Sequence, residues 1–327
     1  RMEVIVANKL YGGTINLMGK SYQKFGWKAV FVNSDNPEAF LREVNEKTRA
    51  IFIESLANPG GVVMDLESIA KVAKEAGVPL IVDNTLATPF LCRPFEWGAD
   101  LVVHSTTKFL SGQGNAIGGV VIDSGKFSWH EKEKFPSLSQ PSPEYSGLTF
   151  AETFGDLAFT MYSHAITLRD LGCSQSPMNA WITLNGIETL SLRMERHCTN
   201  GLAVARFLEK HPNVKWVSHA GLESSPYYKL GKKYMHNGCG SVFTFGVNGG
   251  YESGLKLLES VELFSHVANI GDTRSLILHP ASTTHRQLNE EQRIAAGAGA
   301  EVIRLSIGIE CAEDLICDLK KALGSLS

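Results

Sequence analysis

The sequence predicts an α/β protein built on an open sheet, with two lobes. In the first half of the chain, short apolar and β-branched runs alternate with helical patterns, which is typical of an open α/β sheet. With 327 residues, the chain is long enough for a large core divided between two lobes. A long helical stretch over Pro177–Val204 is expected to connect these lobes.

The first half contains most of the predicted elements. The expected strands cover Val4–Ala7, Ala29–Val32, Ala50–Glu54, Leu80–Val82, Asp100–His104 and Ile117–Ile122. A helix is expected around Asn16–Phe25. Another is expected over Leu66–Ala76, because its apolar residues share one face, Asp65 can cap its start and Gly77 can end it.

The second half has weaker patterns. Between Asp123 and Pro177 the chain is rich in proline and aromatic residues, which indicates a long excursion. The remaining expected strands are Val242–Val247 and Ile303–Ile307, and the remaining helices are Tyr251–Leu258 and Cys311–Leu323.

Composition argues against several classes of function. The net charge is only -3 and the basic residues are scattered, so neither a nucleic-acid site nor a membrane-surface patch is expected. No apolar run approaches the roughly 18 residues of a membrane helix, and the start of the chain does not resemble a signal peptide. The six cysteines form no C-x-x-C pair, which favours a cytoplasmic protein without disulfides. His279 and His285 lie in no metal-binding motif, so no metal site is expected.

Two predicted strands end in residues that suit one cofactor. Asp83 follows one strand, and Ser105, Thr107 and Lys108 follow the next. Ligands of such sheets bind beyond the carboxyl ends of the strands. Pyridoxal phosphate needs an amine for its aldehyde, an acid for its ring nitrogen and donors for its phosphate. Each residue alone has a simpler interpretation as a surface charge or an ordinary strand end, but together they favour this cofactor.

The motifs around these residues resemble a known family. VDNTLATPF and HSTTKFLSGQGNAIGG carry Asp83 and Lys108, and LYGGT, ESLANPGG, SLILHPASTTH and RLSIGIE follow the same order as the family's other blocks. They are similar to the Cys/Met-metabolism family of fold-type I pyridoxal-phosphate enzymes. The resemblance implies a large, mostly parallel seven-stranded domain over residues 1–190 and a smaller α+β domain over residues 191–327. Family members usually carry a further segment before LYGGT, with a phosphate-binding loop and residues lent to a neighbouring subunit.

The same resemblance implies roles in cofactor binding. Lys108 would form the Schiff base with pyridoxal phosphate, and Asp83 would pair with the pyridine nitrogen. Ser105 and Thr107 would bind the phosphate. Tyr11 would stack on the cofactor ring and help to deprotonate the incoming amine, which agrees with the attraction of a cationic ring to an aromatic face.

Roles in substrate binding are implied as well. Arg304, assisted by Ser275, would bind the substrate α-carboxylate, since a guanidinium fork fits a carboxylate. Asn58 would contact both this carboxylate and the cofactor's ring oxygen. The alternative for Arg304 is a structural ion pair with Glu301 or Glu310.

Within the family, the excursion KFPSLSQPSPEYSGLTFAETFG and the run TTHRQLNEEQ are similar to those of the O-acetylhomoserine sulfhydrylases. The expected reaction is a γ-replacement in methionine biosynthesis, which converts O-acetyl-L-homoserine and sulfide to L-homocysteine and acetate. A homo-oligomer, as a tetramer of paired dimers, is expected. The alternatives are a cystathionine γ-synthase, a γ-lyase, or a non-catalytic binding or sulfur-relay protein with the same fold.

Overall fold

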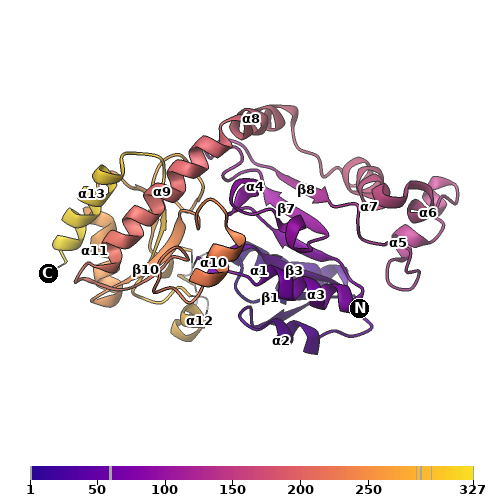
Figure 1. Cartoon of the computed structure of the whole chain (residues 1–327), viewed down its shortest axis with the longest axis horizontal. Helices are drawn as coiled ribbons and strands as arrows, with labels where there is room; N and C mark the ends of the chain where they lie inside the picture. Colours follow the sequence, from indigo (N-terminus) through magenta and orange to yellow (C-terminus); the bar gives the residue numbers. More distant parts are fainter. Residues whose placement is uncertain (1, 59–60, 285, 288, 296, 327) are drawn as a thin grey trace.

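The chain forms two lobes that lie side by side along its longest axis (Figure 1). The computed structural model describes residues 2–58, 61–284, 286–287, 289–295 and 297–326. His285 and two residues of the ESLANPGG block therefore lie outside the described residues. The predicted division at residue 190 falls at the first residue of α9 (Leu190–Glu209), which runs from one lobe into the other, and the exact boundary stays a prediction.

A six-stranded sheet forms the centre of the first lobe, in the order β2-β1-β3-β6-β7-β8. Its strands are β1 (Glu3–Ala7), β2 (Lys28–Val32), β3 (Thr48–Glu54), β6 (Leu80–Asp83), β7 (Leu101–Ser105) and β8 (Gly119–Asp123). All pairings are parallel except that of β8 with β7, which confirms a mostly parallel sheet. The expected count of seven strands is wrong for the described residues. The edge strands β2 and β8 each pair on one side only; β8 has no buried residue, and β2 buries only Val32.

The helices of this lobe follow the predicted pattern with some differences. α3 (Leu66–Ala76) is confirmed with both ends, because the Asp65 side chain accepts from the Ser68 N–H and Gly77 adopts φ 61°. The helix expected from Asn16 starts earlier, as α1 (Gly12–Asn16). It continues as a π-helix over Leu17–Ser21 and a 3-10 helix over Tyr22–Phe25. The short elements α2 (Pro37–Arg42), α4 (Thr88–Leu91), β4 (Leu56–Ala57) and β5 (Val62–Val63) were not predicted.

The excursion after β8 extends from the far end of the first lobe (Figure 1). It contains the short helices α5 (Pro136–Ser139), α6 (Phe150–Phe154) and α7 (Ala158–Tyr162). The long helical stretch predicted over Pro177–Val204 is found as two helices, because Thr189 separates α8 (Pro177–Glu188) from α9. Thr189 breaks the helix at φ -105° and ψ 6°, and Arg193 holds the break by donating to the Gly186 carbonyl and the Thr189 hydroxyl.

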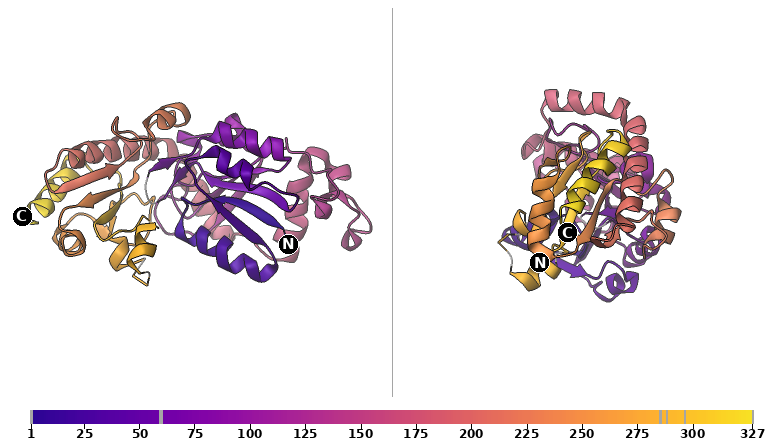
Figure 2. Two further views of the ribbon diagram at one scale, coloured as in Figure 1. Left: turned by 90° about the horizontal axis from the view of Figure 1, so that it is seen from below. Right: turned by 90° about the vertical axis from the view of Figure 1, so that its left-hand side faces the viewer.

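The second lobe is built on a five-stranded sheet in the order β11-β12-β13-β10-β9. Its strands are β9 (Val214–Ser218), β10 (Val242–Val247), β11 (Ser265–His266), β12 (Leu276–Leu278) and β13 (Val302–Ser306). The helices are α10 (Tyr228–Tyr234), α11 (Gly250–Ser260), α12 (Glu290–Ala295) and α13 (Ala312–Gly324). Figure 2 shows α9, α11 and α13 against the strands of this lobe. The smaller α+β lobe is thus confirmed.

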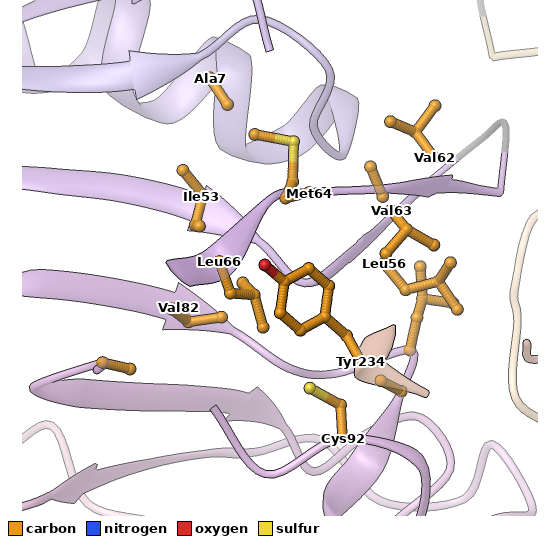
Figure 3. Packing of buried hydrophobic residues seen from close by; sticks show 14 of the residues in the cluster. Ala7, Ile53, Leu56, Val62, Val63, Met64, Leu66, Val82, Cys92 and Tyr234 are labelled. Atoms are coloured by element: carbon orange, nitrogen blue, oxygen red, sulfur yellow. The ribbon is translucent and has the colours of Figure 1, made fainter. Parts of the chain in front are cut away.

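Buried side chains connect the two lobes. Leu190 and Met194 at the start of α9 belong to the core of the first lobe, whereas Val204 and Leu208 near its end belong to the core of the second. Tyr234 of α10 is fully buried and packs into the first core, beside the side chains around β3 and β6 (Figure 3). These contacts hold the second lobe against the carboxyl ends of the first sheet.

Candidate active site

A hollow lies where the carboxyl ends of β3, β6 and β7 face the second lobe. It encloses about 570 Å³ of empty space, including its open mouth. The polar side chains that line it are Tyr11, Glu54, Asn58, Asp83, Thr85, Ser105 and Lys108 from the first lobe, and Asn269 and Arg304 from the second. The strand ends predicted from sequence therefore meet at one rim, as expected for an open α/β sheet.

Asp83 is held at the end of β6 by Thr85. Its Oδ1 accepts from the Thr85 backbone N–H at 2.9 Å and from the Thr85 hydroxyl at 2.5 Å. The Thr85 hydroxyl also accepts from the Ser105 N–H at 2.9 Å, which joins the ends of β6 and β7. Burial raises the pKa of Asp83, while the two hydrogen bonds from Thr85 oppose this rise. Thr85 was not predicted as a site residue, although a hydroxyl two residues after an aspartate is a common local partner.

Lys108 follows β7 and is half-buried at the base of the hollow. Its Nζ donates to Oδ1 of Asn269 at 2.6 Å. Burial lowers the pKa of Lys108, and the charge of Arg304 lowers it further. A lowered pKa makes the neutral amine, which is the form that can attack an aldehyde or accept a proton, easier to reach.

Arg304 of β13 presents a half-buried cation to the hollow. Its Nη2 donates to the Asn269 carbonyl at 3.3 Å, and it forms no ion pair among the residues that the structure describes. Burial lowers its pKa to about 10. Glu310 instead accepts from the backbone N–H and hydroxyl of Ser275, at 2.6 and 2.9 Å. The ion pair of Arg304 with Glu301 or Glu310, weighed as an alternative from sequence, is absent within these described ranges.

Two predicted residues do not line the hollow. Ser275 is fully buried, and its hydroxyl donates to Glu310 and accepts from the Gly308 N–H at 2.8 Å. The Thr107 hydroxyl accepts from the Gly118 N–H at 3.2 Å. Both hydroxyls are engaged by their own surroundings, so their placement does not support the predicted contacts with a carboxylate or a phosphate. Asn269, which no sequence pattern indicated, takes the position beside Arg304.

Tyr11 and Asn58 reach the hollow from two separate loops, and the side chain of Glu54 bonds to both loops. Tyr11 directly precedes α1 and is 53% exposed, so its ring is accessible at the mouth. Oδ1 of Asn58 is buried and has no hydrogen-bond partner in the described part of the chain. Glu54, also missed as a site residue, accepts from the backbone N–H groups of both residues.

Comparison with known proteins decides the family. A sequence model of the Cys/Met-metabolism PLP-dependent enzymes matches residues 2–324. The chain belongs to this family. The family and the cofactor predicted from sequence are therefore confirmed.

Several members of the family are close to this chain. An O-acetyl-L-homoserine sulfhydrylase of Leptospira meyeri is 46% identical over 99% of this chain and 75% of its own length. A homocysteine synthase of Schizosaccharomyces pombe is also 46% identical, over 98% of this chain and 75% of its own length. A crystal structure of a candidate O-acetylhomoserine (thiol)-lyase from Campylobacter jejuni matches with a TM-score of 0.95 and 40% identity, covering 99% of this chain and 77% of that one. That structure contains a lysine modified by the pyridoxyl phosphate group.

The side chains in the hollow fit the family's cofactor. Lys108 supplies the amine, and the oxygen of Asp83 that Thr85 does not bind is available for a ring nitrogen. The unpartnered Oδ1 of Asn58 needs a donor, which a ligand can supply. Ser105 brings a hydroxyl to the same hollow. The described residues contain no cluster of three or more metal-binding side chains, and none of their helices is long and apolar enough to cross a membrane.

Proposed function

We propose that this protein is an O-acetylhomoserine sulfhydrylase. It replaces the acetate of O-acetyl-L-homoserine by sulfide: the Cγ–O bond breaks, a Cγ–S bond forms, and L-homocysteine and acetate leave. The observation that carries this proposal is the half-buried cation of Arg304, unpaired among the described residues, in the same hollow as Lys108 and Asp83, which suits an amino acid beside the family's cofactor. The names of the Leptospira and Schizosaccharomyces relatives support the choice of reaction.

Arg304 binds and orients the substrate in this proposal. Its partly buried guanidinium lacks a carboxylate partner in the described chain, so a substrate α-carboxylate would offset the cost of withdrawing its charge from water. The Asn269 carbonyl accepts one of its N–H groups and thereby fixes the direction of the fork. Asn58 lines the same hollow with an amide that can contact the same carboxylate.

Lys108 accepts a proton from the substrate, and Asp83 keeps a proton on the cofactor ring. When bound, pyridoxal phosphate supplies an electron sink that acidifies the α-hydrogen of an amino acid. Nζ of Lys108 accepts this proton, which its lowered pKa permits. Asp83 holds a proton on the ring nitrogen, and Thr85 keeps the carboxylate in place. Tyr11 covers the mouth with its ring, and Ser105 donates to the phosphate.

Product analysis tests this function. The intact protein, loaded with pyridoxal phosphate, is given O-acetylhomoserine with sulfide, with cysteine, or with no sulfur compound. Homocysteine and acetate in equal amounts should dominate in the first reaction only. Cystathionine as the main product with cysteine would identify a cystathionine γ-synthase. A 2-oxo acid and ammonia without any sulfur compound would identify a γ-lyase, and no product at all would favour a binding or relay protein.

We also propose that the protein is a homo-oligomer, as a tetramer of paired dimers. α8 buries only Thr183, while Met178, Trp181 and Leu184 are each more than 60% exposed. Contiguous exposed apolar surface of this kind marks protein interfaces. Light scattering should give four chain masses, and Trp181→Glu should lower the mass. A monomer at all concentrations would contradict the proposal.

The six cysteines are unpaired, which supports a cytoplasmic location.

A further inference from the structure

Glu54 ends β3 at the back of the hollow and is only 4% exposed. Its nearest strand neighbour is Asp83, directly opposite in the register of β3 and β6. Glu54 forms no ion pair with a cation in the part of the chain that the structure describes. Ionising a buried carboxyl group without a cation is costly, and hydrogen bonds to its oxygens reduce this cost.

Both oxygens of Glu54 are used, and each holds a different loop. Oε1 accepts from the Tyr11 backbone N–H at 2.7 Å, and Oε2 accepts from the Asn58 N–H at 3.1 Å. Tyr11 belongs to the turn that leads into α1, whereas Asn58 follows β4. The side chains of both residues line the same hollow. One carboxylate therefore sets the position of two site residues that lie on separate segments.

We propose that Glu54 is a positioning residue, whose two oxygens hold the backbones of Tyr11 and Asn58 so that the Tyr11 ring and the Asn58 amide face the cofactor and the substrate. This inference rests on the proposed function, because that function assigns Tyr11 and Asn58 to the site. Glutamine cannot replace Glu54 in this role. Its amide oxygen can accept one N–H group, but its NH₂ group would face the other.

The charges in the hollow support this role in the loaded enzyme. Burial, and secondly the negative charge of Asp83, raise the pKa of Glu54 to about 8, while the two backbone donors oppose the rise. Lys108 and Arg304 are the cations that line the same hollow, and neither pairs with Glu54. A protonated pyridine ring paired with Asp83 would cancel the effect of the Asp83 charge on the pKa of Glu54. Glu54 would then ionise more readily, and both N–H bonds would become stronger, because a charged acceptor binds N–H groups more tightly.

The test uses the full chain loaded with pyridoxal phosphate, with Glu54→Gln and, as a matched control, Glu75→Gln on the exposed face of α3. Hydrogen exchange followed by mass spectrometry compares the segments that contain Tyr11 and Asn58 with α3. We expect exchange in both segments to rise at least about tenfold in Glu54→Gln, while α3 is unchanged. The kcat/KM for O-acetylhomoserine should fall about 10- to 100-fold, as for the loss of a charged hydrogen bond.

A second background separates positioning from general support of the fold. In the Tyr11→Ala/Asn58→Ala protein, Glu54→Gln should lower kcat/KM by less than about threefold, because the groups it positions are already missing. An equal loss in both backgrounds, or unchanged exchange at Tyr11 and Asn58, would overturn the inference. If Glu54→Gln does not fold, Glu54→Asp, which keeps the charge but is one methylene shorter, should show the same local increase in exchange. If the wild type makes no homocysteine, the proposed function fails, while exchange and titration of cofactor affinity still test Glu54.

Discussion

Nζ of Lys108 donates a 2.6 Å hydrogen bond to Oδ1 of Asn269, across 161 residues of sequence and from one lobe to the other. The backbone carbonyl of Asn269 also accepts from Arg304. The two cations of the hollow are thus oriented by a single residue in the loop between β11 and β12. In the proposed function Lys108 accepts a proton and Arg304 binds the carboxylate, so each residue can be tested separately.

Lys108→Ala should abolish both the visible absorbance of the covalently held cofactor and nearly all turnover, because the anchor and the base are lost together. Absorbance spectra and a homocysteine assay measure the two effects. Lys126→Ala, an exposed lysine on the same lobe, is the control and should leave both unchanged. Borohydride reduction followed by peptide mapping should label Lys108, and labelling of another lysine would contradict its assignment.

Asp83→Asn should leave the cofactor bound but slow the reaction severely, because an amide cannot keep a pyridine nitrogen protonated. The size and geometry of the side chain are nearly unchanged, so Thr85 can still hold its Oδ1. Cofactor content by absorbance and kcat by product formation separate binding from chemistry. A turnover close to that of the wild type would remove Asp83 from the mechanism.

Arg304→Ala should lower kcat/KM by a factor that corresponds to about 2–5 kcal/mol of lost binding free energy in the transition state. This is the usual cost of truncating one partner of a buried charged pair. The loss should appear mainly as weaker substrate affinity, with an unchanged cofactor spectrum. Arg42→Ala, at an exposed position of α2, should have no effect. Loss of the visible absorbance in Arg304→Ala would instead show that Arg304 supports the cofactor or the fold.

Three buried histidines should make the protein sensitive to acid. Burial lowers the pKa of His104, His197 and His219 from 6.5 to about 4. Each of these histidines has a lower pKa in the folded protein than the 6.5 of the unfolded chain. The folded protein therefore keeps its full free energy of unfolding above pH 6.5. It loses part of this free energy as the pH falls towards 4, because the unfolded chain binds protons first. At pH 5 each histidine should cost about 2 kcal/mol of unfolding free energy.

Urea unfolding at pH 7.5 and pH 5 measures this loss. His219→Gln should be less sensitive to acid than the wild type, because an amide does not titrate in this range. His130→Gln, at an exposed site, should behave like the wild type. Equal unfolding midpoints at the two pH values would contradict the prediction.

Local patterns were sufficient for the strands of the first sheet and for placing Asp83 and Lys108 at one hollow. α3 was predicted with its cap and its glycine end, because helix termini depend on the residues next to them. Asp83 and Lys108 were predicted to share a rim because parallel strands bring their carboxyl ends together. The same reasoning did not predict the break at Thr189 within the helical stretch over Pro177–Val204. Arg193, four residues further on, bonds to the Thr189 hydroxyl but also donates to the Phe109 carbonyl, which is distant in sequence.

The sequence by itself determined the fold class, the family resemblance and the residues whose chemistry suits pyridoxal phosphate, since these depend on periodicity and on motifs that are contiguous in the chain. Only the tertiary structure decided which of them meet. It placed Asn269 rather than Ser275 beside Arg304, and it assigned Glu54 to the loops of Tyr11 and Asn58. The physical reason is that a hydrogen bond depends on the distance and direction between two groups in space. Where the two groups belong to different strands or different lobes, their spacing along the chain predicts neither the distance nor the direction between them.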